Sequence, residues 1–158
     1  MTVTFSKILV PIDFSGFSRN ALRYAIQFAE QFNAPLHLLY VSEPVIYPPD
    51  FSMGQIAVAA STLEIEKQAA TELQKLAETE IGSRIPYTVT IRAGKPFVEI
   101  IEAAKEDNAD LIIISTHGHS GVEQILFGST ADKVVRKSPC PVLTLREPIK
   151  GFDYKKNI

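Results

Sequence analysis

The chain has 158 residues, of which 46% are hydrophobic and 22% are charged, a balance typical of one folded domain rather than of a disordered chain. Its formal net charge of -2, without a long run of Lys or Arg, argues against a nucleic-acid-binding surface. No apolar stretch approaches the roughly 20 residues of a membrane span, and the first residues do not resemble a secretion signal. We therefore expect a cytoplasmic protein with no nucleic-acid and no membrane partner.

The first part of the chain alternates apolar runs with amphipathic segments. Residues 7–11 and 36–41 are short apolar runs that end at proline or before polar residues, which predicts two buried strands. Between them, apolar residues recur every three or four positions from Leu22 to Phe32, a pattern typical of a helix with one buried face. Ser18 is the expected N-cap of this helix.

A segment with three prolines, residues 44–54, predicts a long surface loop. After it we expect a helix from about Ala59 to Ile81, because Gly82 supplies a stop signal. The side chains expected to face inward from this helix are Leu63, Ala70, Leu73, Leu76 and Ala77.

The second half of the chain continues the alternation. Residues 87–92 are rich in β-branched side chains and predict a strand with one wetter side, at an edge of the sheet. Pro96 opens a helix, and the apolar run 111–114 predicts another strand buried on both faces. A helix over residues 128–137 and a last strand over residues 141–145 complete the pattern.

Strands and helices that alternate in this way predict a parallel sheet with helices on both faces. We expect one domain over residues 1–146 and a polar, partly disordered tail over residues 147–158. In such sheets, ligands bind beyond the C-terminal ends of the strands, where the strand order reverses. If the first and fourth strands are central neighbours, Asp13 and Gly118 lie side by side at that crevice.

Two glycine-containing turns form the most informative motif. Ser115-x-x-Gly118 follows the buried fourth strand, and nine residues later Gly128-Ser129 opens a helix. The free amides and the dipole at a helix start favour an anion. We therefore interpret the two turns as facing each other around a phosphate chain.

With these turns, the opening Lys-Ile-Leu-Val-Pro-Ile-Asp and the closing Pro-Cys-Pro-Val-Leu, the chain resembles the universal stress protein family over nearly its whole length. The resemblance implies a Rossmann-like, adenine nucleotide alpha hydrolase-like α/β fold, with a single open five-stranded parallel sheet of order 3-2-1-4-5. It also implies that the protein binds ATP or AMP and forms a homodimer through its last strand, at Val142, Leu143, Thr144 and Leu145. Ser115 departs from the Gly-x-x-Gly pattern of the family's nucleotide-binding members, so we expect a weakened or altered contact there rather than its loss.

The site that the resemblance implies comprises Pro11, Ile12, Asp13, Val41, Ile114, Ser115, Thr116, His117, Gly118, Gly128, Ser129 and Thr130. Asp13 is expected to accept hydrogen bonds from the ribose or adenine, although a turn or a helix cap would also explain it. Val41 is expected either to pack against adenine or to serve only the core. The two glycines either admit phosphate or only shape turns, and Ser129 is expected to form a capping box with Asp132 while also contacting phosphate.

Three functions remain open. The first is an adenine-nucleotide-binding stress-response protein that acts as a nucleotide-dependent regulatory or protective dimer, with Mg²⁺ as an optional companion of the triphosphate. The second is a slow ATPase or an autophosphorylating protein that uses Ser15, Ser120 or Ser129, but the chain has no Walker lysine after the glycines. The third is a structural dimer that binds no nucleotide, for which Ser115 is the only hint.

Three histidines raise the question of a metal or catalytic site. His117 and His119 have no second ligand at a useful spacing, and His37 lies inside a predicted buried strand. We therefore predict no metal site and no catalytic residue, and we expect His117 to shape its turn by hydrogen bonds.

Overall fold

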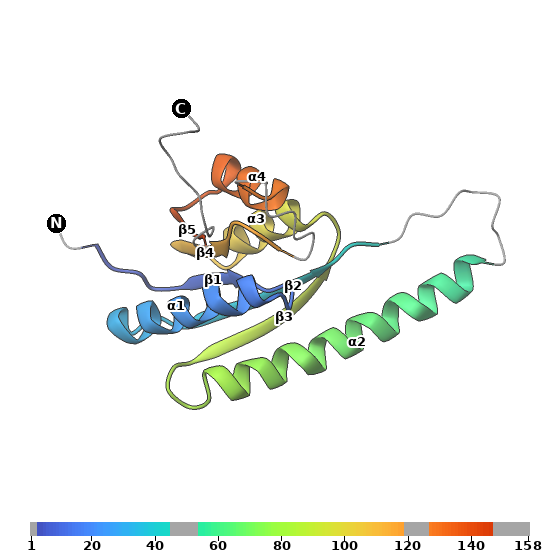
Figure 1. Ribbon diagram of the computed structural model, residues 1–158, viewed down its shortest axis with the longest axis horizontal. Coiled ribbons are helices and arrows are strands. Elements are labelled where there is room, and N and C mark those ends of the chain that lie inside the picture. Colours follow the sequence, from blue (N-terminus) through green and yellow to red (C-terminus); the bar gives the residue numbers. More distant parts are fainter. Residues whose placement is uncertain (1–2, 45–53, 119–126, 147–158) are drawn as a thin grey trace, which may run out of the picture.

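The computed structural model contains a five-stranded parallel sheet between two pairs of helices (Figure 1) and describes residues 3–44, 54–118 and 127–146. The elements in chain order are β1 (Ile8–Pro11), α1 (Gly16–Phe32), β2 (Leu36–Ser42), α2 (Gly54–Glu80), β3 (Tyr87–Ala93), α3 (Pro96–Glu106), β4 (Leu111–Ser115), α4 (Ser129–Lys137) and β5 (Val142–Leu145). The strand order is β3-β2-β1-β4-β5 and every pairing is parallel, so the expected sheet is confirmed. Most of the expected loop over 44–54 and the whole tail over 147–158 lie outside the described residues.

The central strands are apolar on both faces because each face carries a pair of helices. Alternate residues of β1 point to opposite sides, so that Ile8 and Val10 pack towards α1 and α2 while Leu9 packs towards α3 and α4. The same alternation runs through β4, where Ile113 joins the first core and Ile112 the second. This explains the unbroken apolar runs in the sequence.

The N-cap of α1 is Ser15 rather than the expected Ser18. The Ser15 hydroxyl oxygen accepts a hydrogen bond from the Ser18 amide at 3.1 Å, which places Ser18 at the third helical position. The hydroxyl of Ser18 instead donates to the Ser15 carbonyl oxygen at 3.1 Å. The prediction was wrong by one turn because two serines three positions apart carry the same capping signal.

The helix α2 begins at Gly54, earlier than the expected Ala59, and its first half reaches past the ends of the strands (Figure 1). Among its described side chains, from residue 59 onward, the buried ones lie in the second half, at Ala69, Leu73, Leu76 and Ala77, and the buried Ile81 follows the helix. Leu63 is therefore 59% exposed, and Ala70 is exposed as well, so their predicted inward orientation is wrong.

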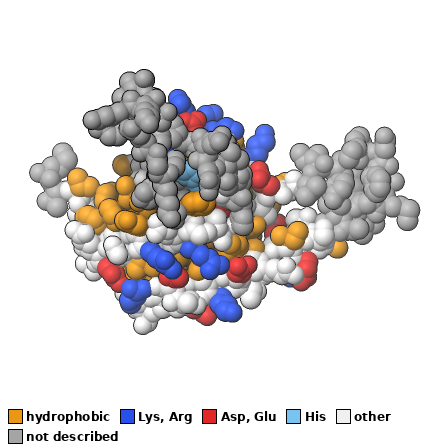
Figure 2. All heavy atoms as spheres, in the orientation of Figure 1, with side chains coloured by type: hydrophobic (Ala, Val, Ile, Leu, Met, Phe, Trp, Pro, Cys, Tyr) orange, Lys and Arg blue, Asp and Glu red, His pale blue; other side chains and the backbone are white. Residues whose placement is uncertain are grey.

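Both outer strands lie at edges of the sheet, as expected for β3. Positively and negatively charged side chains are interspersed over the face seen in Figure 2. Ion pairs link α1 to α2, since Arg19 contacts Glu72 at 3.8 Å and Arg23 contacts Glu80 at 3.7 Å. In the part of the chain that the structure describes, no helix is long and apolar enough to cross a membrane.

Candidate functional site

A cavity of about 670 Å³ opens at the C-terminal ends of the central strands, where the strand order reverses between β1 and β4. All twelve residues singled out from the sequence line it: Pro11, Ile12, Asp13, Val41, Ile114, Ser115, Thr116, His117, Gly118, Gly128, Ser129 and Thr130. They come from four separate segments of the chain. The parallel sheet brings these segments together because it places the ends of its strands along one edge.

Asp13 follows β1 and holds the start of α1. Its Oδ1 accepts hydrogen bonds from the Ser15 amide at 3.0 Å and from the Ser15 hydroxyl at 2.5 Å. The Asp13 amide donates to the hydroxyl oxygen of Ser18 at 3.3 Å. Asp13 therefore stabilises a turn, as the sequence also allowed. These bonds hold its carboxylate at the wall of the cavity.

Gly118 lies directly beside this carboxylate. A Cβ atom added to Gly118 would lie 2.5 Å from Asp13 Oδ2, a separation that real Cβ atoms do not adopt. Asp13 and Gly118 are thus side by side, as the predicted neighbourhood of β1 and β4 requires. A side chain at position 118 would require the Asp13 carboxylate to move, so the available space favours glycine.

Gly128 packs equally closely against the first turn. Its amide donates a 2.6 Å hydrogen bond to the Thr116 carbonyl oxygen, and an added Cβ would lie 2.8 Å from that oxygen. Its φ of -64° is open to any residue, so space rather than backbone conformation favours glycine. The two glycine turns therefore meet at the Thr116 peptide.

The N-cap of α4 is Gly128, with Ser129 as the first helical residue. The expected capping box between Ser129 and Asp132 is absent, since no side chain caps this helix and Asp132 instead pairs with Arg136 at 2.9 Å. The first intrahelical bond runs from the Asp132 amide to the Gly128 carbonyl oxygen at 3.0 Å. The amides of residues 129–131 precede it and have no acceptor within the helix, so α4 directs its positive end into the cavity.

In the first turn, the hydroxyl groups of Ser115 and Thr116 both contact His117. The Ser115 hydroxyl donates to the His117 carbonyl oxygen at 2.7 Å. The Thr116 hydroxyl lies 3.0 Å from Nδ1 of His117, whose ring stacks at 5.4 Å on Phe17 of α1. Thr116 is 2% exposed, so it lies in the floor of the cavity, whereas His119 and Ser120 lie outside the described residues.

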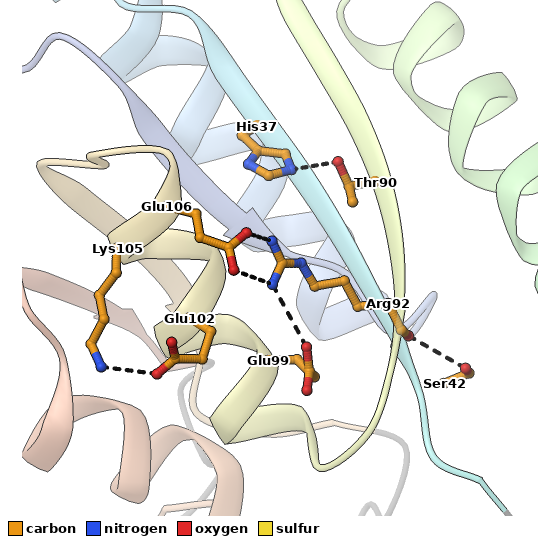
Figure 3. Close-up of polar contacts among 8 residues, drawn as sticks. All are labelled: His37, Ser42, Thr90, Arg92, Glu99, Glu102, Lys105 and Glu106. Carbon is orange, nitrogen blue, oxygen red and sulfur yellow. Dashed lines mark hydrogen bonds and ion pairs between the residues drawn. The ribbon is translucent and has the colours of Figure 1, made fainter.

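One wall of the cavity is the first turn of α3, through Pro96 and Ile100, which sequence reasoning did not assign to the site. Polar contacts fix this helix to the sheet, because Arg92 of β3 pairs with Glu106 and, at 3.7 Å, with Glu99 (Figure 3). Bonding to Glu106 raises the pKa of Arg92. The remaining unassigned lining residues are Phe14, Ser18, Leu39, Tyr40, Glu43 and Ala131.

Phe14 adopts an unusual backbone conformation at the mouth of the cavity. Its φ of 63° is uncommon for a bulky residue, and its ring lies 5.1 Å from that of Tyr40. Burial, and then the charge of Asp13, raise the pKa of Tyr40, which keeps the phenol protonated at neutral pH. The only sequence signal for these residues was their place just after β1 and at the end of β2.

His37 belongs to a separate cluster behind α3. Its Nε2 lies 2.8 Å from the Thr90 hydroxyl oxygen (Figure 3), and its Nδ1 contacts the Asp107 carboxylate at the C-terminal end of α3. Burial lowers the pKa of His37 in spite of the opposing effect of Asp107. Across residues 3–44, 54–118 and 127–146, no three His, Cys, Asp or Glu side chains are grouped so that they could hold a metal ion.

Comparison with known proteins identifies relatives of the whole chain. Residues 4–146 match the model of the Universal stress protein family. Universal stress protein MJ0531 of Methanocaldococcus jannaschii is 35% identical over 148 residues, which cover 92% of this chain and 85% of that protein. The solved structure of MJ0577 from the same organism matches with a TM-score of 0.80 at 25% identity, over 92% of this chain and 99% of that one. A universal stress protein in complex with cAMP has a TM-score of 0.61 at 24% identity, over 91% of this chain and 98% of that one, which shows a common fold.

Proposed function

The chain belongs to the universal stress protein family, and we propose that it binds an adenine nucleotide, ATP or AMP, in the cavity beside β1 and β4. One observation carries this proposal. Two glycines from turns that meet at Thr116 lie so close to the Asp13 carboxylate and to the Thr116 carbonyl oxygen that a Cβ atom at either position would force a neighbouring group to shift. Turns of this kind present main-chain groups to a ligand, an arrangement that suits phosphate oxygens.

The residues around the cavity have distinct proposed roles. The amides of Ser129, Thr130 and Ala131 at the start of α4 would donate to phosphate oxygens. The Gly128 amide is already bonded to Thr116, so Gly128 contributes a compact turn rather than a donor. Asp13 would accept a hydrogen bond from the ribose or base. Val41, which packs with the core on the side of α3, would contact adenine.

We propose further that the protein acts as a nucleotide-dependent regulatory or protective dimer in the stress response. The strand β5 is at an edge of the sheet, and Val142, Leu143, Thr144 and Leu145 are half-buried. The Thr116 amide donates to the Leu145 carbonyl oxygen at 2.9 Å, and the Thr116 carbonyl accepts from Gly128. The backbone of one residue, Thr116, is thus bonded both to the turn before α4 and to the proposed dimer edge. Any coupling between nucleotide and partner binding must be reciprocal.

The direct test is to identify what the protein carries and binds. Small molecules released from freshly purified protein are identified by mass spectrometry. Nucleotide-free protein is then titrated calorimetrically with AMP, with ATP in the presence and absence of Mg²⁺, and with GTP as a control for the base. Release or saturable binding of an adenine nucleotide is expected, and no heat with AMP or ATP at millimolar concentration would overturn the proposal.

A further inference from the structure

Ser115 stands at the position where the nucleotide-binding pattern of the family has its first glycine. It is the last residue of β4, it is half-buried, and it lines the cavity. Its hydroxyl donates a 2.7 Å hydrogen bond to the carbonyl oxygen of His117, two residues further along. Glycine at this position would leave that carbonyl without this donor.

This hydrogen bond bears on how Ser115 could meet a nucleotide. A serine hydroxyl has one proton, and here the His117 carbonyl oxygen takes it. Phosphate oxygens at neutral pH are acceptors, so Ser115 could bond phosphate only by giving up its bond to His117. The Ser115 hydroxyl therefore donates its hydrogen bond within the protein and not to the phosphate chain.

His117 is held from a second side as well. The neighbouring Thr116 hydroxyl lies 3.0 Å from Nδ1 of the His117 ring, and the ring itself packs against Phe17. The main chain and the side chain of His117 are thus fixed independently. At the next residue, Gly118, a methyl group would lie 2.5 Å from Asp13 Oδ2 and would displace that carboxylate. A turn with so little free space is sensitive to small displacements of His117.

We propose that Ser115 is a positioning residue, whose hydroxyl fixes the turn from Ser115 to Gly118 in the conformation that receives the nucleotide. This inference rests on the proposed nucleotide site. Its physical basis is that a turn ordered before binding does not have to be ordered during binding. The serine is thus an alternative to the family's glycine that strengthens the site, in contrast to the weaker contact that the sequence suggested.

Three substitutions test this role. Ser115→Ala removes the hydroxyl, Ser115→Gly removes it and restores the family pattern, and Ser115→Thr retains it. For the alanine and glycine variants we expect AMP affinity to fall about threefold to tenfold, the effect of one hydrogen bond. The threonine variant should remain within about twofold of the unchanged protein, since it keeps the donor.

Amide hydrogen exchange in nucleotide-free protein supplies a readout that does not depend on binding. Exchange at Thr116 and Gly128, whose amides are hydrogen-bonded at this turn, should accelerate in the alanine and glycine variants and return to the original rate in Ser115→Thr, while exchange at Ile112 in β4 stays unchanged. Unchanged exchange at Thr116 and Gly128, or AMP binding by Ser115→Gly as tight as in the unchanged protein, would overturn the inference. If the unchanged protein binds no AMP or ATP, the proposed function fails and the ligand role of Ser115 fails with it, while the exchange data still decide whether the hydroxyl fixes the turn.

Discussion

The amide nitrogen of Gly128 lies 2.6 Å from the carbonyl oxygen of Thr116, and this hydrogen bond joins the two glycine turns. The two residues are separated by a segment that includes positions 119–126, yet the turns form one surface of the cavity. The spacing between the glycines in the sequence therefore has a structural meaning. It sets the start of α4 against the end of β4.

Gly128→Ala should disturb this junction without straining the backbone. The new methyl group would lie 2.8 Å from the Thr116 oxygen, so the turns must separate. We expect a loss of about 1–3 kcal/mol in the free energy of unfolding, typical of overpacking, together with weaker AMP binding. Urea denaturation and calorimetry measure the two effects. A variant with unchanged stability would show that the junction relaxes freely.

Gly118→Ala should affect binding more than stability. Its methyl group would meet Asp13 Oδ2 at 2.5 Å, which forces apart two groups that line the cavity. We expect AMP affinity to fall by about tenfold or more, since misplaced groups in a rigid site lose several contacts at once. Gly16→Ala is the matched control, because a Cβ at Gly16 meets nothing within 4 Å. Equal affinities for the two variants would argue against the proposed site.

Ser15→Ala tests the cap of α1 and its connection to the site. The substitution removes the acceptor of the Ser18 amide and the hydroxyl that bonds Asp13. The free energy of unfolding should fall by about 1–2 kcal/mol, as for other N-caps. Ser83→Ala, at an exposed serine outside the helices, should change it by less than about 0.5 kcal/mol. Equal urea midpoints for both variants would exclude the assigned cap.

His37 should make the stability of the protein depend on pH. Burial lowers the pKa of His37 below its ordinary value of 6.5, so the unfolded chain takes up a proton at a higher pH than the folded protein. The contribution of neutral His37 to the free energy of unfolding is therefore complete above about pH 6.5, the pKa in the unfolded chain. It is lost as the pH falls from there through the lowered pKa of the folded protein. Urea denaturation between pH 7.5 and about pH 5 should show a steeper loss for the unchanged protein than for His37→Gln. If the free energy of unfolding depended on pH in the same way in both proteins, the lowered pKa of His37 in the folded protein would be refuted.

If the protein dimerises through β5, charged substitutions on β5 should disrupt the dimer, whereas a charged substitution on the opposite edge strand, β3, should not. Leu143→Asp and Thr144→Lys place charge on β5 and should shift the protein to a monomer in sedimentation. The second variant is included because Leu143 also packs against the core, whereas Thr144 is not part of either apolar core. Thr88→Lys on the opposite edge strand, β3, should leave the dimer intact. A dimer that persists in both β5 variants would refute this interface.

The sequence predicted the sheet well because its signals are local and strong. Apolar runs such as Leu111–Ile114 mark strands buried on both faces, and the family resemblance, which rests partly on the glycine spacing, implied the residues that line one cavity. The order of the strands came from the family resemblance rather than from the runs themselves. The structure confirms that order.

Other features depend on three-dimensional neighbours and were not predictable. Ser15 and Ser18 are equivalent as capping residues in sequence, and the structure distinguishes them because the Ser15 hydroxyl oxygen accepts from the Ser18 amide. The outward position of Leu63 follows from a helix that is longer than the sheet it packs on. The wall formed by Pro96 requires knowledge of how α3 crosses the sheet, which Arg92 of β3 helps to fix through Glu99 and Glu106 of that helix.

The close contact between Gly118 and Asp13 also constrains how this protein can evolve. A larger residue at position 118 requires the Asp13 carboxylate either to leave its bonds to Ser15 or to be replaced by a smaller side chain. A change at position 118 alone therefore displaces the carboxylate, and a change at position 13 alone removes it. Descendants of this sequence should therefore retain both residues together or replace both, and a lineage that has lost the aspartate is the one in which the glycine becomes free to vary.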